Sequence, residues 1–221
     1  MDYVKAMEFQ QIIHSQRVNN LREDTIIILE HPNTITLGRR SDQTHIISSK
    51  SKLKDSGFKV VSTDRGGQAT FHGPGQLIIY PIINIREQNF SPLSYVRFLE
   101  NIVISSTKKI GVKTRKIEGE TGVWVDSEDT LKKIASIGVK ISNGVSLHGL
   151  ALNVSTELNM FRHIIPCGEP DSEFTNLNIE LNNDISVKDV SNLITKEICS
   201  FLGKIKIDEN YDFANFRKIN E

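Results

Sequence analysis

The chain has 221 residues, with 27 Lys and Arg against 27 Asp and Glu, so its formal net charge is zero. This length is enough for one large domain with a buried core, and we expect a single domain over residues 1–221. The lack of a basic excess argues against nucleic-acid binding. Apolar runs such as Leu77–Ile85 are too short to cross a membrane, and the N-terminal MDYVKAMEFQQ has no signal-peptide core, so we expect a cytoplasmic protein.

The first third of the chain predicts one helix followed by short strands. Lys5–Leu21 carries apolar residues at helical spacing. Thr25–Glu30 is typical of a buried strand, and Ile35–Gly38 is expected to continue the same sheet after a turn. Phe58–Ser62 predicts a further short strand.

A glycine-rich segment, Arg65–Gln76, follows that strand and leads directly into the apolar run Leu77–Ile85. We interpret RGGQATFHGPGQ as a loop before a core strand, and two explanations of its four glycines stay open. They form two tight turns, or they let a ligand approach the backbone closely. Arg65 and His72 add a cation and a titratable ring, which favours the second explanation. No Walker or dinucleotide motif is present.

The second half of the chain predicts a helix, further strands and a last helix. Ser91-Pro92 is a good helix start, and Lys108, Lys109 and Gly111 suit its end. The later expected elements are strands at Gly122–Val125, Lys133–Ile141 and Val145–Val154, and a helix at Val187–Leu202 that is capped by Ser186 and closed by Gly203. Together these elements predict an α+β fold in which helices pack around a mixed β-sheet.

Two cysteines are too few for a disulfide framework, and the six histidines show no paired ligand spacing, so we expect no metal site. Cys199 lies in a helical pattern and fits the core. Cys167 lies between a proline and a glycine, which indicates a turn. It is either a bystander or a thiol that a substrate can reach.

Three further residues invite both a structural and a chemical interpretation. Lys133 shares a strand face with Ala135, so it is either an edge lysine or a buried cation that lowers the pKa of a nearby thiol, whereas Lys132 is expected to face solvent. His148, just before Gly149, is either a hydrogen-bonded core residue or part of a site. Trp124 fits the core better than a stacking platform.

Several segments together resemble one family. RGGQATFHGPGQLIIYPI, KKIASIGVKI, VSLHGLALNV and FRHIIPCG, in this order and spacing, are similar to the lipoyl(octanoyl) transferases, the octanoyltransferases of lipoate biosynthesis, and LEHPNTITLGRR is similar to an early segment of that family. The resemblance runs roughly from Thr25 to Leu177. It implies the fold shared by biotin and lipoate protein ligases.

The resemblance also implies roles for particular residues. Cys167 matches the family's nucleophile, and Lys133 matches the lysine that activates it. The positions that match substrate-binding segments, together with His148, are Arg65, Gly66, Gly67, Gln68, Ala69, Thr70, Phe71, His72, Ser136, Ile137, Gly138, Gly149, Leu150 and Ala151. Two departures are Phe71, where tyrosine is frequent, and Lys132, where arginine is common.

The implied reaction moves an octanoyl group from octanoyl-acyl carrier protein to one lysine of a lipoyl domain, in 2-oxoacid dehydrogenase complexes or the glycine cleavage H protein. A thioester donor suits a cysteine relay, so no ATP, metal or other cofactor is expected. We expect a monomer. A basic face is expected for the acidic carrier, although an ordinary solvated face explains any single cluster slightly better. The candidate clusters are Arg39 and Arg40, or Lys108, Lys109, Lys113, Arg115 and Lys116.

Three alternatives remain at this point. An ATP-dependent lipoate or biotin ligase on the same fold needs no cysteine and stays fully active in Cys167→Ser. A related amidotransferase uses the same thiol with an octanoylated lipoyl-type donor. A catalytically inactive acyl-binding module binds its ligand without a covalent adduct.

Overall fold

A large sheet forms the centre of the structure, a computed structural model that describes residues 1–41, 43–127, 130–166, 172–202 and 206–208. Within these residues its strands run in the order β11-β1-β5-β9-β8-β7-β6, and β10 pairs with β8. Their bounds are β1 Thr25–Leu29, β5 Gln76–Ile82, β6 Thr114–Arg115, β7 Val123–Ser127, β8 Thr130–Ser142, β9 Val145–Asn153, β10 Glu173–Phe174 and β11 Lys206–Asp208. The pairs β1–β11 and β8–β10 are parallel and the others antiparallel, so the predicted mixed sheet is confirmed.

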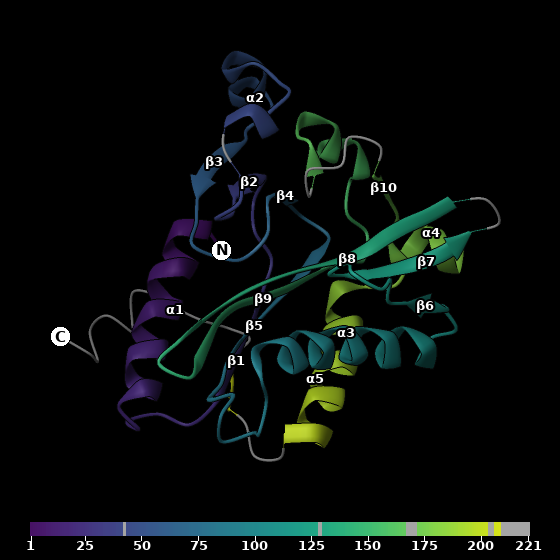
Figure 1. The fold of residues 1–221 in the computed structure, drawn as a ribbon. Coiled ribbons are helices and arrows are strands. Elements are labelled where there is room, and N and C mark those ends of the chain that lie inside the picture. Colours follow the sequence, from purple (N-terminus) through teal and green to yellow (C-terminus); the bar gives the residue numbers. More distant parts are fainter. Residues whose placement is uncertain (42, 128–129, 167–171, 203–205, 209–221) are drawn as a thin grey trace.

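Helices cover both faces of this sheet (Figure 1). Helix α1 (Tyr3–Val18) packs on one face, while α3 (Pro92–Lys109) and α5 (Val187–Leu202) pack on the other. The predicted start of α3 is confirmed, because the Ser91 hydroxyl accepts the backbone N–H of Ser94 at 3.1 Å. The predicted start of α5 is confirmed in the same way, because Ser186 accepts the N–H of Asp189 at 3.0 Å. The expected stop at Gly203 lies outside the described residues.

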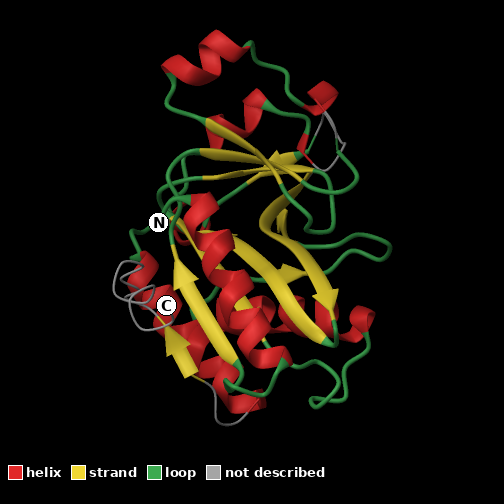
Figure 2. Ribbon diagram, turned by 90° about the vertical axis from the view of Figure 1, so that its left-hand side faces the viewer, coloured by secondary structure: helices red, strands yellow, loops and turns green. Residues whose placement is uncertain are grey.

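A second sheet of order β3-β2-β4 stands above the large sheet in Figures 1 and 2. Its strands are β2 (Thr34–Leu37), β3 (Lys59–Ser62) and β4 (Ala69–His72). The expectation that Ile35–Gly38 continues the first sheet is therefore wrong. After the turn that follows β1, β2 pairs instead with β3 and β4, and its apolar residues enter a core of their own.

The glycine-rich segment is also more regular than predicted, because Ala69–His72 is a strand rather than a loop. Its side chains alternate between two environments. Ala69 and Phe71 pack in the core of the small sheet, whereas the side chain of His72 turns toward the large sheet, where its ring stacks on Tyr3 with the centroids 5.7 Å apart. This two-residue period is the ordinary pattern of a strand.

The remaining helices are short. They are α2 (Lys50–Asp55) and α4 (Leu177–Leu181), with 3-10 turns at Gln43–His45 and Leu158–His163. Among the described residues, no helix combines the length and the apolar character that a membrane span requires.

Candidate active site

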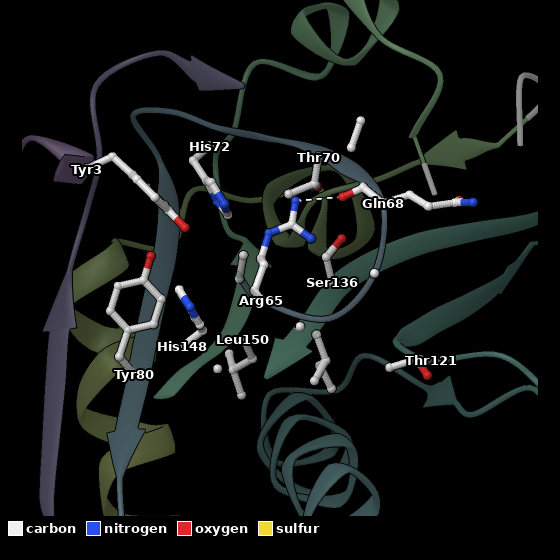
Figure 3. A pocket seen from close by; sticks show the side chains of 16 residues that line it. Tyr3, Arg65, Gln68, Thr70, His72, Tyr80, Thr121, Ser136, His148 and Leu150 are labelled. Carbon is white, nitrogen blue, oxygen red and sulfur yellow. Dashed lines mark hydrogen bonds between the residues drawn. The ribbon is translucent and has the colours of Figure 1, made fainter. Parts of the chain in front are cut away.

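A narrow cavity of about 50 Å³ lies where the small sheet meets strands β8 and β9 of the large one. All of the predicted substrate-binding residues line it except Gly66 and Phe71. Figure 3 shows the side chains that face it, with Arg65 near the middle and Thr121 at one side. Segments that lie far apart in the sequence therefore meet at one site, as the resemblance implied.

The two exceptions have plain structural reasons. The ring of Phe71 is 1% exposed and packs against Phe58 and Phe161, on the face of β4 that points away from the cavity. The backbone of Gly66 is hydrogen-bonded to β8, since its N–H donates to the carbonyl of Val139 at 2.9 Å. Neither residue touches the cavity, so a substrate role for them stays a prediction without support from the geometry.

Arg65 holds the segment before β4 against β2. Its Nη2 donates to the carbonyl oxygens of Thr36 at 2.8 Å and Gln68 at 2.7 Å. Its Nε donates to the Thr36 hydroxyl at 3.2 Å, and its Nη1 donates to the carbonyl of Gly66 at 3.0 Å. Arg65 is 7% exposed, so its buried guanidinium is part of the cavity wall.

Two glycines let backbones approach each other at the cavity. A Cβ on Gly138 would lie 2.9 Å from the carbonyl oxygen of Gly66, and a Cβ on Gly149 would lie 2.2 Å from that of Ile79. Real Cβ atoms do not come so close to backbone atoms. Gly138 and Gly149 are therefore required because a neighbouring stretch of backbone passes close to each of them.

Lys133 is a buried cation on β8, shortly before the residues of β8 that line the cavity. It is 3% exposed, and its Nζ lies 4.7 Å from the ring centroid of Trp124, which is itself buried. An aromatic face stabilises an ammonium that has left water. Lys132 is half-buried, so the expectation that it is the more exposed of the two lysines is confirmed.

Cys167 lies outside the described residues. The chain is described again from Ser172, and it then pairs with β8 so that Phe174 stands opposite Lys133. The backbone N–H of Thr175 also donates to the carbonyl of Lys133 at 3.1 Å. The segment that follows residues 167–171 therefore runs beside Lys133.

One side of the cavity is formed by aromatic side chains that the sequence did not single out. Tyr3 and Tyr80 lie beside His72 and His148 in Figure 3. His31 packs against Tyr3, with the ring centroids 4.9 Å apart. Its Nδ1 donates a hydrogen bond to the carbonyl of Met1, and its Nε2 is hydrogen-bonded to the Tyr80 hydroxyl, each at 2.8 Å. We call Tyr3, His72, Tyr80 and His148 the aromatic end of the cavity.

The histidines at and behind the aromatic end are neutral near pH 7. Burial lowers the pKa of His31 to about 4 and lowers the pKa of His72 well below its usual range. Burial also lowers the pKa of His148, although the carboxylate of Asp64, 2.8 Å from Nε2, opposes that shift. Within the part of the chain that the structure describes, no three His, Cys, Asp or Glu side chains form a group that could hold a metal ion.

Comparison with known proteins gives first the class and then the family. The fold matches a bipartite lipoate protein ligase from Thermoplasma acidophilum with a TM-score of 0.69, over 95% of this chain and 86% of that one, at 16% identity. At that identity the match shows the fold alone. A model of the lipoyl protein ligase A/B catalytic domain matches residues 2–199.

Two curated relatives are much closer in sequence. An octanoyltransferase of Koribacter versatilis is 40% identical over 198 residues, which cover 89% of this chain and 78% of the relative. The mitochondrial octanoyltransferase LIP2 of Arabidopsis thaliana is 39% identical over 205 residues, which cover 92% and 84%. The chain belongs to the octanoyltransferase family, the acyltransferases of lipoate biosynthesis. The predicted family and enzyme class are thus confirmed.

Proposed function

We propose that this enzyme transfers an octanoyl group from octanoyl-acyl carrier protein to a specific lysine of a lipoyl domain, through a thioester on Cys167. The acceptors are the lipoyl domains of 2-oxoacid dehydrogenase complexes and the glycine cleavage H protein. The whole chain serves as one catalytic domain. The observation that carries the proposal is the buried Lys133 on β8, a strand that lines the cavity from Ser136 onward and pairs at Lys133 with β10, the strand that follows residues 167–171.

The cavity suits an apolar acyl chain. Ile137, Leu150 and Ala151 line it from β8 and β9, and Gly138 and Gly149 keep it narrow. The acyl carbonyl lies toward Lys133 and the chain extends along β8. This direction places the reacting carbonyl nearest to β10, the strand that follows residues 167–171 in the chain.

The chemistry proceeds in two acyl transfers. The Cys167 thiolate attacks the donor carbonyl carbon, a new C–S bond forms, and the carrier's C–S bond breaks to release the carrier thiolate, which takes a proton. The acceptor lysine then attacks the same carbonyl, a C–N bond forms, and the C–S bond to Cys167 breaks. The donor thioester already carries the activation energy, so no ATP is consumed.

Lys133 supports both transfers. An ammonium beside a thiol lowers the thiol pKa and raises the fraction of thiolate, which is the nucleophile. In the second transfer the attacking amine must lose a proton, and the departing Cys167 thiolate or a neutral Lys133 accepts it. The Trp124 ring, beside the Lys133 ammonium, holds the lysine side chain in place.

Transfer assays with octanoyl-acyl carrier protein and a lipoyl domain, without ATP, test this assignment. Lys133→Met is expected to lower kcat by about 100-fold or more, because a positioned acid–base group contributes that much. Ser136→Leu, which fills the cavity, is expected to raise KM for the octanoyl donor, whereas Ser142→Leu, at the end of the same strand and outside the cavity, is expected to leave it unchanged.

Two results would overturn the proposal. If Lys133→Met transfers octanoyl at the wild-type rate, Lys133 has no part in the mechanism. Activity that needs ATP and free octanoate instead of the carrier-bound thioester identifies a ligase.

A further inference from the structure

Pro81 interrupts the pairing between the two central strands β5 and β9. The strands pair regularly from Gln76 opposite Asn153 to Ile79 opposite Leu150. Proline has no N–H to donate. The Pro81 carbonyl accepts side-chain hydroxyls, from Ser146 at 2.7 Å and from Tyr95 at 3.3 Å. The part of β9 opposite Pro81 is therefore released from β5.

His148 lies in this released part and has a left-handed backbone, with φ of 59°. This conformation is uncommon for a residue with a Cβ and tends to occur at functional sites. Its N–H donates to Oε1 of Gln10 on α1 at 2.7 Å. A side chain from a neighbouring layer thus replaces the missing strand partner.

The left-handed backbone changes the direction of the His148 ring. Leu147 and Ala151 of β9 belong to the core that packs on α1, while Leu150 belongs to the core on the opposite face. Strict alternation would place His148 with Leu150. Its ring instead lies 6.4 Å from the ring of Tyr80, which belongs to the α1 core, and it lines the cavity.

The two ring nitrogens of His148 have different surroundings. Nε2 lies 2.8 Å from Oδ1 of Asp64, and Oδ2 of Asp64 accepts a hydrogen bond from Lys140 at 2.7 Å. A carboxylate only accepts hydrogen bonds, so the proton of the neutral ring is on Nε2. Nδ1 then carries a lone pair, is buried, and has no hydrogen-bond partner among the described residues.

We propose that Nδ1 of His148 is an acceptor subsite at the aromatic end of the cavity, for a hydrogen-bond donor carried near the far end of the bound acyl chain. A hydroxyl on the chain supplies the donor that this buried atom lacks, because a buried polar atom is normally paired. The inference rests on the proposed function, since it requires that the cavity holds the acyl chain.

The lengths are compatible with this placement. Val139 pairs with His148, so the line along β8 from Ser136 to His148 spans three residues, or roughly 10 Å. An extended eight-carbon chain, with C–C bonds of about 1.5 Å, is roughly 9 Å long. The last carbons of an octanoyl chain whose carbonyl lies beside Ser136 therefore reach His148.

A matched pair of substrates separates an acceptor subsite from a merely apolar wall. A hydroxyl donates to Nδ1, whereas a ketone oxygen of nearly the same size only accepts and leaves Nδ1 unpaired. Hydroxy- and oxo-octanoyl groups, substituted at carbons 5, 6 or 7 and carried on acyl carrier protein, provide this comparison. Wild-type enzyme is expected to prefer the hydroxyl at one of these positions by roughly 5- to 150-fold in kcat/KM.

Asp64→Asn reverses the polarity of the subsite. Lys140 donates to the oxygen of the new amide, so the amide N–H turns toward Nε2, and the ring proton moves to Nδ1. Nδ1–H donates to both substrates, so the preference for the hydroxyl is expected to disappear. Lys140→Met leaves the carboxylate on Nε2 and is the matched control, expected to keep the wild-type preference.

Equal use of the two substrates by wild-type enzyme at every position would overturn the inference, as would an unchanged preference in Asp64→Asn. Nitrogen-15 spectra of the histidine side chains test the same atom independently of whether Asp64→Asn folds. The His148 signals, identified by their loss in His148→Asn, are expected to show the proton on Nε2, and a proton on Nδ1 would contradict the inference.

Unsubstituted octanoyl donor, assayed in parallel, separates the two proposals. If wild-type enzyme does not transfer it, the proposed function fails, and the nitrogen spectra still decide the acceptor atom. If it is transferred while the substituted pair is not distinguished, only the subsite is wrong.

Discussion

Replacing Arg65 by lysine tests how much the guanidinium fork holds the cavity wall. The fork donates to four acceptor atoms, which are the carbonyl oxygens of Thr36, Gly66 and Gln68 and the Thr36 hydroxyl. A lysine keeps the charge, but its single nitrogen has three donors and cannot span both edges of the fork. At least one buried acceptor loses its partner.

The expected cost follows from these contacts. A hydrogen bond to a charged group contributes about 1.5–3 kcal/mol, so Arg65→Lys is expected to lower the free energy of unfolding by about 2 kcal/mol. With a urea dependence of about 2 kcal/mol per molar, the unfolding midpoint falls by about 1 M. Trp124 is the only tryptophan and is buried, so its fluorescence reports the transition.

Arg40→Lys is the control, because Arg40 is exposed and the exchange there alters no buried contact. Its midpoint is expected to equal that of the wild type. An Arg65→Lys midpoint that coincides with that of Arg40→Lys would refute the view that the fork holds the segment in place. Arg65→Lys is also expected to raise KM for the acyl donor, because the cavity wall that Arg65 holds in place becomes less rigid.

Three further predictions concern the scaffold. Gly149→Ala is expected to lower the unfolding free energy by about 1–3 kcal/mol in thermal unfolding, because the new Cβ meets the Ile79 carbonyl; a wild-type transition would show that β5 and β9 can separate freely. Folded His31 resists protonation, with its pKa lowered from 6.5 to about 4, so stability is expected to fall by about 3 kcal/mol as pH falls through this range. Urea titrations should show a smaller loss in His31→Gln, and an equal loss would assign the effect elsewhere. Ser91→Ala removes the cap of α3 and is expected to lower the free energy of unfolding in urea by about 1 kcal/mol. An unchanged free energy would show that the cap does not stabilise the helix.

The elements with strong periodicity could be predicted from the sequence. The stripe of Tyr95, Phe98 and Ile102 and the cap at Ser91 define α3 without tertiary information. The greater exposure of Lys132 than of Lys133 follows from strand geometry alone. These features depend on neighbours along the chain, which the sequence displays directly.

Features that depend on distant contacts were not predicted. Ala69–His72 alternates like a strand, but the surrounding glycines concealed the pattern, and its partner β2 lies more than 30 residues earlier. The turn after β1 gave no sign that β2 leaves the first sheet. Tyr3 enters the cavity only because α1 packs across β5 and β9, and nothing in its local sequence indicates that.

In the candidate site, too, local sequence patterns could be predicted and distant contacts could not. The family resemblance indicated the segments that line the cavity, but it could not separate side chains that face it from those that do not. Phe71 faces a separate core, whereas His148, with its left-handed backbone, lines the cavity. Such orientations are set by pairing between strands, so they appear only in the assembled fold.

The most direct test of the central claim is the mass of the intact protein after incubation with octanoyl-acyl carrier protein in the absence of ATP. Wild-type enzyme is expected to gain one octanoyl group, which added lipoyl domain then removes, and Cys167→Ser is expected to gain none. An unmodified wild-type protein that nevertheless octanoylates the lipoyl domain, or a Cys167→Ser variant with full activity, would contradict the cysteine relay.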